Sequence, residues 1–173
     1  MEDMENDIFA MVRREADKHN LLLGKRIGTS YLTRSFECYR KTNSSLVISE
    51  SSGPCELVIK IFWKALIPDQ ASAIAIMDTN FNKQGRNIVA ILENHNLLGK
   101  PAYLMPKYPY NLRTLLEDFK INQKFFKYVA FMIIKTLLNA HKNRIYHLNI
   151  KPENILFDKH HVPFLTDWLN RNV

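Results

Sequence analysis

The residues whose types and spacing could do chemistry gather in the last third of the sequence. His147, Asn149, Lys151 and Asn154 fall within eight positions, and Asp167 follows 13 residues after Asn154. The carboxylate of Asp167 is an oxygen donor of the kind that binds Mg²⁺. The amide of Asn149 has no basic oxygen at neutral pH and no negative charge, so it cannot accept a proton in catalysis. The set therefore suits contacts with ions better than proton transfer.

Residues 147–156 read HLNIKPENIL, which resembles the catalytic loop HRDLKPENIL of eukaryotic-type protein kinases at seven of ten positions. The resemblance implies that Lys151 steadies the transferring phosphate and that Asn154 holds a metal ion. It places Asn149 where the family carries the Asp that accepts the substrate proton, and Leu148 where the family carries an Arg. The resemblance thus indicates a kinase-like chain that lacks the catalytic Asp.

Two further positions fit the same resemblance. Asp167 lies where the D-F-G motif begins, with Trp168 for Phe and Leu169 for Gly, which implies a metal-binding carboxylate. Lys60, inside the apolar run 57–63, resembles the lysine of V-A-I-K that contacts the nucleotide phosphates. Plainer interpretations remain open: Asp167 as a solvated acid, and Lys60 as a side chain that reaches solvent at a strand edge.

The remaining nucleotide-binding signals are weaker. Residues 27–36 align with the glycine-rich loop, but only Gly28 is kept, since Ser30 and Thr33 replace the second and third glycines. Residues 105–108 resemble the hinge that faces adenine, which brings in Met105 and Tyr108. The candidate nucleotide-binding residues that the resemblance implies are Gly28, Lys60, Met105, Tyr108, Asn154 and Asp167.

The glutamate that would pair with Lys60 in the family is not found where it is expected. No Glu occurs between Glu56 and Glu93, and the only acids in that interval are Asp69 and Asp78. We therefore expect no intact ion pair of the family type.

Hydrophobic periodicity predicts the elements that position these residues. Helices are expected over 4–19, 69–81, 111–119 and 123–143, and strands over 21–28, 31–39, 46–48, 57–63, 87–92, 102–105, 155–157 and 162–165. A turn is expected over 158–161. The order resembles an α+β, protein-kinase-like fold: an N-lobe with an antiparallel sheet and one helix, then the start of a helical C-lobe.

The expected organisation is a helical extension over 1–20 and an incomplete kinase-like domain over 21–173. Its N-lobe would cover about 21–106 and its partial C-lobe about 107–173. The sequence given ends six residues beyond Asp167, before the later C-lobe helices of the family. We expect the apolar face of the 123–143 helix, with Phe125, Val129, Met132, Ile133 and Leu137, to need cover from a second copy or from a partner such as a full-length protein kinase. A fragment of a longer kinase is an alternative.

Bulk properties exclude several classes. The 173 residues are 46% hydrophobic and 24% charged, which is typical of globular proteins. Cys38 and Cys55 are too few for a disulfide framework, so we expect an intracellular, cytoplasmic location. No apolar run approaches 18 residues, so no membrane insertion is expected. The net charge of +7 is scattered, which favours a solvated basic surface over nucleic-acid binding.

These observations predict a catalytically impaired pseudokinase that serves as an interaction or regulatory module and binds ATP and Mg²⁺ weakly. One alternative is a weakly active serine/threonine-type kinase, because positioning and charge dominate phosphoryl transfer and another group could replace the missing base. Another is a basic scaffold for nucleic acid or anionic surfaces, suggested by the net charge alone.

Overall fold

The computed structural model describes residues 2–41, 55–63, 87–118 and 121–168. The chain divides into two compact units: the first unit is Met1–Ala65 with Ile91–Lys107, and the second unit is Leu66–Ala90 with Tyr108–Val173. The expected strand over 46–48 and the expected helix over 69–81, with Asp69 and Asp78, lie outside the described residues.

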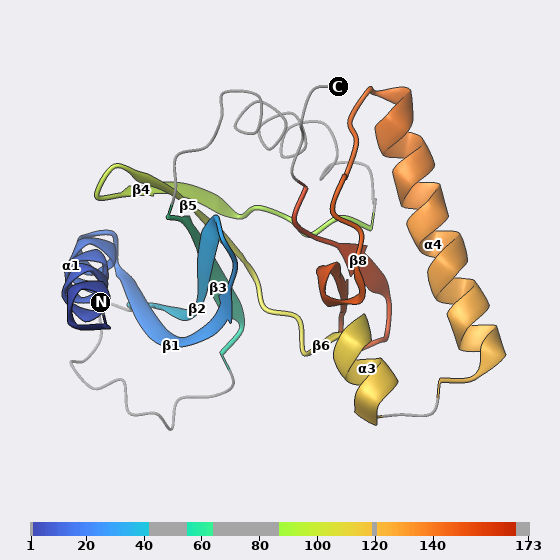
Figure 1. Cartoon of the computed structure of the whole chain (residues 1–173), viewed down its shortest axis with the longest axis horizontal. Coiled ribbons are helices and arrows are strands. Elements are labelled where there is room, and N and C mark those ends of the chain that lie inside the picture. The colour runs from blue at the N-terminus through green and yellow to red at the C-terminus, as the bar shows by residue number, and fades with distance from the viewer. Residues whose placement is uncertain (1, 42–54, 64–86, 119–120, 169–173) are drawn as a thin grey trace. The chain divides into compact units, whose positions relative to one another are not determined.

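The first unit contains a five-stranded antiparallel sheet in the order β1-β2-β3-β5-β4 (Figure 1). The strands are β1 (Leu21–Thr29), β2 (Thr33–Arg40), β3 (Leu57–Phe62), β4 (Glu93–Leu97) and β5 (Lys100–Pro106). Alternating apolar side chains explain one buried face, to which β1 contributes Leu21 and Leu23 and β2 contributes Phe36 and Cys38. The strands expected over 21–28, 31–39, 57–63 and 102–105 are thereby confirmed.

Helix α1 (Glu2–Lys18) packs against this buried face (Figure 1). Val12 and Ala16 are fully buried in the same hydrophobic cluster as the inner sheet residues. Phe9 stacks on Phe36 of β2, with ring centroids 4.8 Å apart. The helix is therefore part of the core of the first unit.

The strand expected over 87–92 is wrong, because that apolar run is divided between the two units. In the second unit, Ile88 and Val89 are buried, Ile88 forms a single parallel bridge with Leu165, and the Val89 N–H donates to the Leu165 carbonyl at 3.1 Å. In the first unit, the Leu92 N–H donates to the Leu104 carbonyl at 2.8 Å. The strand that pairs with β5 is β4, whose polar sequence Glu-Asn-His-Asn-Leu gives no strand signal.

The second unit combines helices with a small sheet in the order β6-β7-β8. Its elements are β6 (Tyr110–Asn111), α3 (Leu112–Asp118), α4 (Gln123–Lys142), the short 3₁₀ helix η2 (Pro152–Asn154), β7 (Ile155–Phe157) and β8 (Pro163–Leu165). Helix α4 begins where the Asn122 side chain accepts a hydrogen bond from the Phe125 N–H at 2.8 Å. The expected helices over 111–119 and 123–143, the strands over 155–157 and 162–165, and the turn between those strands are confirmed.

One face of α4 lies in the core of the second unit, alongside the small sheet (Figure 1). Val129, Ile133, Thr136 and Ala140 are buried on it, and Phe125 and Leu137 are partly buried. The expectation that this face needs cover from another chain is therefore wrong, because the β-strands and α3 of the same unit already supply it. The apolar side chains that remain exposed lie elsewhere on the helix.

The described residues thus form a mixed α+β chain with an antiparallel sheet and three α-helices, α1, α3 and α4. None of these helices is long and apolar enough to cross a membrane. Cys38 and Cys55 are free thiols, and burial raises the pKa of Cys38 to about 12, so this thiol stays protonated.

Candidate functional site

The loop that resembles the kinase catalytic loop is closed by a ring of four hydrogen bonds in the second unit. The Thr166 N–H donates to the Asn154 carbonyl at 3.0 Å, and Asn154 Nδ2 donates to the Asn149 carbonyl at 2.8 Å. The Asn149 N–H donates to His147 Nδ1 at 3.2 Å, and His147 Nε2 contacts the Thr166 carbonyl at 2.8 Å. The ring ties the loop after α4 to the segment just before Asp167.

His147 is a neutral member of this ring. A carbonyl oxygen only accepts, so Nε2 carries the proton toward Thr166, and Nδ1 is the acceptor for the Asn149 N–H. The imidazole is 1% exposed and packs on the Trp168 indole with centroids 4.5 Å apart. Burial lowers the pKa of His147 from 6.5 to about 4 against smaller opposing effects of its hydrogen bonds. At neutral pH, His147 is therefore uncharged and stabilises the loop through its two hydrogen bonds.

Two residues bordering this ring have left-handed backbone conformations. Leu148 has φ 58° and Asp167 has φ 63°, a region that residues other than glycine seldom enter. Such strain persists only where surrounding contacts fix the backbone, at about 1–3 kcal/mol per residue. The ring supplies such contacts, because it bonds His147 and Asn149 on either side of Leu148 and Thr166 directly before Asp167.

Two side chains whose oxygens could bind a metal ion lie in this ring or directly next to it. Asn154 is 4% exposed, its Nδ2 is committed to Asn149, and no described residue donates to its Oδ1. Asp167 is half-buried and directly follows Thr166, whose N–H is bonded to the Asn154 backbone. Among the described residues, no three His, Cys, Asp or Glu side chains form a metal cluster. An ion here would need oxygens from Asn154, Asp167, water and a phosphate, which is the usual environment of Mg²⁺.

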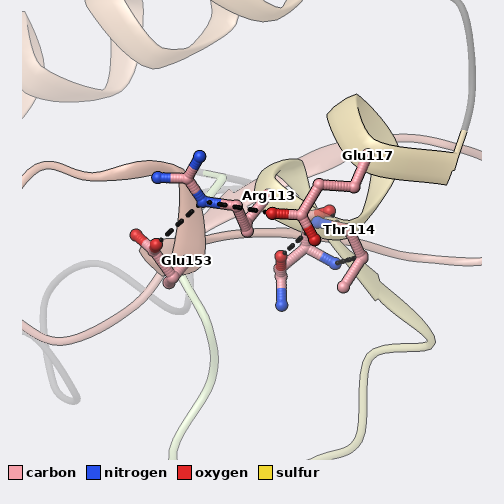
Figure 2. A network of polar contacts seen from close by, with 5 residues as sticks. Arg113, Thr114, Glu117 and Glu153 are labelled. Carbon is pink, nitrogen blue, oxygen red and sulfur yellow. Dashed lines mark hydrogen bonds and ion pairs between the residues drawn. The ribbon is translucent and has the colours of Figure 1, made fainter.

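Glu153, inside the same motif, forms a surface contact with α3. Figure 2 shows Arg113 between two carboxylates: its Nε lies 3.0 Å from Oε1 of Glu153 and 3.8 Å from Oε1 of Glu117. Helix α3 starts with reciprocal bonds between Asn111 and Thr114, in which each side chain accepts from the backbone N–H of the other. Lys151, the candidate phosphate ligand, is exposed just before η2.

The first unit places the other candidates on one face of its sheet. Gly28 pairs with Ser35, Ser35 with Lys60, and Lys60 with Tyr103, so Gly28 and Lys60 lie in one cross-strand row. Met105, two residues beyond Tyr103, points to the same face because side chains alternate along a strand. Strand β3 is paired on both sides, which contradicts the interpretation of Lys60 as a side chain at a strand edge.

The same face carries an acid that the sequence analysis missed. Glu37 pairs with Val58 in β3, and is thus two residues from Lys60 in register. It is 8% exposed, and its Oε1 lies 2.7 Å from the Lys107 ammonium and 3.8 Å from that of Lys25. An unpaired buried carboxylate is costly, so these lysines explain how Glu37 is tolerated. The clue in the sequence was an acid between Phe36 and Cys38 in an alternating strand.

The turn between β1 and β2, at the place of the glycine-rich loop, is closed on itself. The Ser30 Oγ accepts from the N–H groups of Leu32 at 3.3 Å and Thr33 at 3.0 Å, and it contacts the Thr33 hydroxyl at 2.9 Å. The Ser30 N–H donates to the Thr33 carbonyl at 2.9 Å. A phosphate cradle needs free backbone N–H groups, so three of the amides in this turn do not suit one.

Tyr108 belongs to the second unit, where its ring packs against Phe164 with centroids 5.0 Å apart. Burial raises the pKa of Tyr108 to about 12, so its phenol stays protonated. The candidate residues are therefore divided between the units: Tyr108, Asn149, Lys151, Asn154 and Asp167 lie in the second, and Gly28, Lys60 and Met105 lie in the first.

No protein-family model matches the chain. Two curated proteins of Candida albicans, both named serine/threonine-protein kinase CLA4, are each 30% identical to it over 91 residues. The match covers 50% of this chain and 9% of each relative, so the chain spans a small part of the length of the proteins it resembles. This distant similarity supports a kinase-like relationship.

Proposed function

We propose that the chain is a catalytically impaired, protein-kinase-like protein that acts as an interaction or regulatory module. The observation that carries the proposal is the hydrogen-bond ring around Asn149, which uses the backbone of that residue and leaves an amide where a kinase needs a carboxylate. The motif residues His147 and Asn154 then serve to hold the loop in shape, whether or not phosphate is transferred.

Weak binding of ATP with Mg²⁺ is part of the proposal. In the second unit, Asn154 and Asp167 would hold the ion through oxygen, and Lys151 would contact a phosphate. Lys60, in the first unit, is a separate candidate for a phosphate contact. When bound, the ion would neutralise phosphate charge. In the first unit, the closed turn at Ser30 withholds backbone amides that could otherwise contact a phosphate.

The experiment for this part is a thermal-shift titration of the whole chain with ATP and Mg²⁺. Ligand that binds the folded state raises apparent stability by mass action. We expect a small shift that disappears in Lys60→Ala and in Asp167→Ala, and that persists in the matched surface controls Lys159→Ala and Asp118→Ala. A shift that both site variants retain would contradict the assignment of these residues.

A weakly active kinase is the second candidate, favoured by the presence of Lys151, Asn154 and Asp167 in one unit. Incubation with radiolabelled ATP and Mg²⁺ or Mn²⁺ separates the two. Incorporation by the wild-type chain that is lost in Asp167→Ala would favour the active kinase. Equal background incorporation of label by the wild-type chain and by Asp167→Ala would favour the impaired protein.

The interaction role predicts a protein partner in the cytoplasm, with a full-length protein kinase as the first class to test. Pull-down with the whole chain and a panel of purified kinase domains would measure this directly. Retention of none of them, by a chain that stays monomeric, would count against the kinase-mimic form of the proposal.

A further inference from the structure

The side of α4 that faces away from the core carries an apolar stripe. Phe131, Ile134 and Leu138 are 63%, 57% and 56% exposed. They follow one another at i, i+3 and i+7, a spacing that puts all three on one face of a helix. Single exposed apolar residues are ordinary on protein surfaces, but three in one row form a patch of the kind that marks interaction sites.

Lysines border the stripe. Lys127 and Lys135 lie one turn before and one turn after Phe131, and Lys142 lies one turn after Leu138. All three are exposed, and the sequence of α4 contains no Asp or Glu. The surface is therefore an apolar row with Lys127 and Lys142 at its two ends and Lys135 along one side.

We propose that this stripe docks an amphipathic helix of a different protein, with apolar residues at helical spacing and Asp or Glu along its edges. This inference rests on the interaction role proposed above and is independent of nucleotide binding. Apolar anchors seated in a helical groove would supply affinity, and acids facing the lysines would supply specificity and speed of association.

Charge argues against a second copy of the chain as the occupant. A symmetric contact between two α4 helices sets the same surface against itself, so lysines would meet lysines. The net charge of +7 on each copy adds repulsion. A partner with acids at the edges turns the same lysines into an attraction.

The shape of the stripe argues against an anionic membrane. Helices that lie in the bilayer interface bury a broad apolar face among the lipids and keep a strongly charged face in water. Here the broad apolar face, with Val129 and Ile133, is buried in the protein core. From Phe131 to Leu138 the exposed apolar side chains form a narrow row, which matches the seam between two helices.

The test is a selection from a displayed library of amphipathic helices, each with leucines fixed at i, i+3 and i+7 and with randomised edge positions. The whole chain is immobilised as bait. We expect Asp and Glu to be enriched at the edges of the selected helices. Synthetic copies of the selected helices should bind the variant Leu138→Ser about tenfold more weakly than wild type, or weaker still. The same loss of affinity is expected for the triple variant Lys127→Glu, Lys135→Glu and Lys142→Glu.

Met11→Ser is the matched control, because Met11 of α1 is also an exposed apolar residue, at 53%. It should bind the selected helices as wild type does, and thermal unfolding shows that each variant is folded. Asp167→Ala should also bind them normally, which separates this surface from the nucleotide site.

Several results would overturn the proposal. Selected helices without acidic enrichment, or helices that bind Leu138→Ser as tightly as wild type, would contradict it. A dimer in sedimentation that Leu138→Ser dissolves would assign the stripe to self-association. Binding to phosphatidylserine vesicles that the same variant loses, in the absence of helix binding, would assign the stripe to a membrane. Capture of a kinase domain unaffected by Leu138→Ser would keep the interaction role but remove this surface from it.

Discussion

The β1–β2 turn and the loop after α4 are two polar segments in which side chains satisfy the backbone. In the loop, the residues that make the bonds, His147 and Asn154, are those that match the kinase pattern. In the turn, the residues that make the bonds, Ser30 and Thr33, are those that depart from it. Of these two segments, the loop keeps the pattern at the residues that bond its backbone, and the turn departs from the pattern at the positions of the second and third glycines.

The backbone conformations also differ between the loop and the turn. Leu148 and Asp167 hold left-handed conformations that the loop imposes. Gly28 needs no such freedom: a Cβ added there would lie 3.5 Å from the Ser35 Cβ, an ordinary contact. The one glycine retained from the glycine-rich pattern is thus not required by this turn, which supports a loop that no longer approaches a phosphate closely.

The largest expected effect is a pH dependence of the free energy of unfolding that comes from His147. Its pKa is about 4 in the folded state and 6.5 ordinarily, so between these values the unfolded chain binds a proton that the folded chain does not. Stability should fall as the pH drops from about 6.5 to about 4, by up to ~3 kcal/mol. Urea unfolding from pH 7 to pH 4 measures this.

His147→Gln is the control for that series, because an amide cannot titrate in this range. Protonation of carboxylates also lowers the free energy of unfolding in acid, and it does so in both proteins. Glu93 is an example, because its hydrogen bond to Arg40 is the chief cause that lowers its pKa. The difference between wild type and His147→Gln should therefore isolate the histidine. Parallel curves for the two proteins would show that His147 is not buried in its neutral form.

Removal of the Asn154 side chain tests the ring directly. Asn154→Ala deletes the donor to the Asn149 carbonyl, and the loss of a buried hydrogen bond with its partner left unpaired costs ~1–3 kcal/mol. Asn96→Ala, at an exposed position of β4, should change the free energy of unfolding by less than ~0.5 kcal/mol. Chemical denaturation compares the two, and equal small effects would contradict a structural role for Asn154.

Opening the β1–β2 turn should destabilise the chain less than Asn154→Ala does. It should also strengthen nucleotide binding. Ser30→Gly removes the acceptor for two backbone N–H groups and should destabilise the first unit by ~1 kcal/mol. The freed amides should enlarge the thermal shift with ATP and Mg²⁺ relative to wild type. Ser35→Gly, on the neighbouring strand, is the control, and no gain in Ser30→Gly over Ser35→Gly would contradict the closed-turn argument.

The smallest effect is expected at the surface contact of the loop. Arg113→Ala breaks the ion pairs with Glu153 and Glu117, which are exposed and screened by solvent. We expect no measurable change in the unfolding midpoint at physiological salt. A large loss of stability would mean that the contact with α3, rather than the ring, holds the loop.

Local patterns predicted most of the elements that position these residues. The helical spacing of Val129, Ile133 and Leu137 predicted α4 and its buried face, and the apolar run around Lys60 predicted β3. Alternation and periodicity are properties of neighbouring residues, so the sequence alone can reveal them. The apolar run over 87–92 misled because burial in two different units gives the same pattern as a strand.

The site could be predicted less fully. The motif identified His147, Asn149 and Asn154, but their ring closes through the backbone of Thr166, which carries no signal in a side-chain pattern. Glu37 was missed because its lysine partners lie on other strands or far away in the sequence. The exposed stripe on α4 became visible only once the packing showed which face of the helix the core already covers.

The most direct test of the central claim is to restore the missing carboxylate with Asn149→Asp and to measure transfer from radiolabelled ATP in the presence of Mg²⁺. Our account holds that the loop is retained for structure and that the closed turn at Ser30 withholds phosphate contacts that catalysis also needs. It predicts that Asn149→Asp incorporates no more label than Asn149→Ala. Incorporation in Asn149→Asp that requires Mg²⁺ and disappears when Asp167→Ala is added would contradict it.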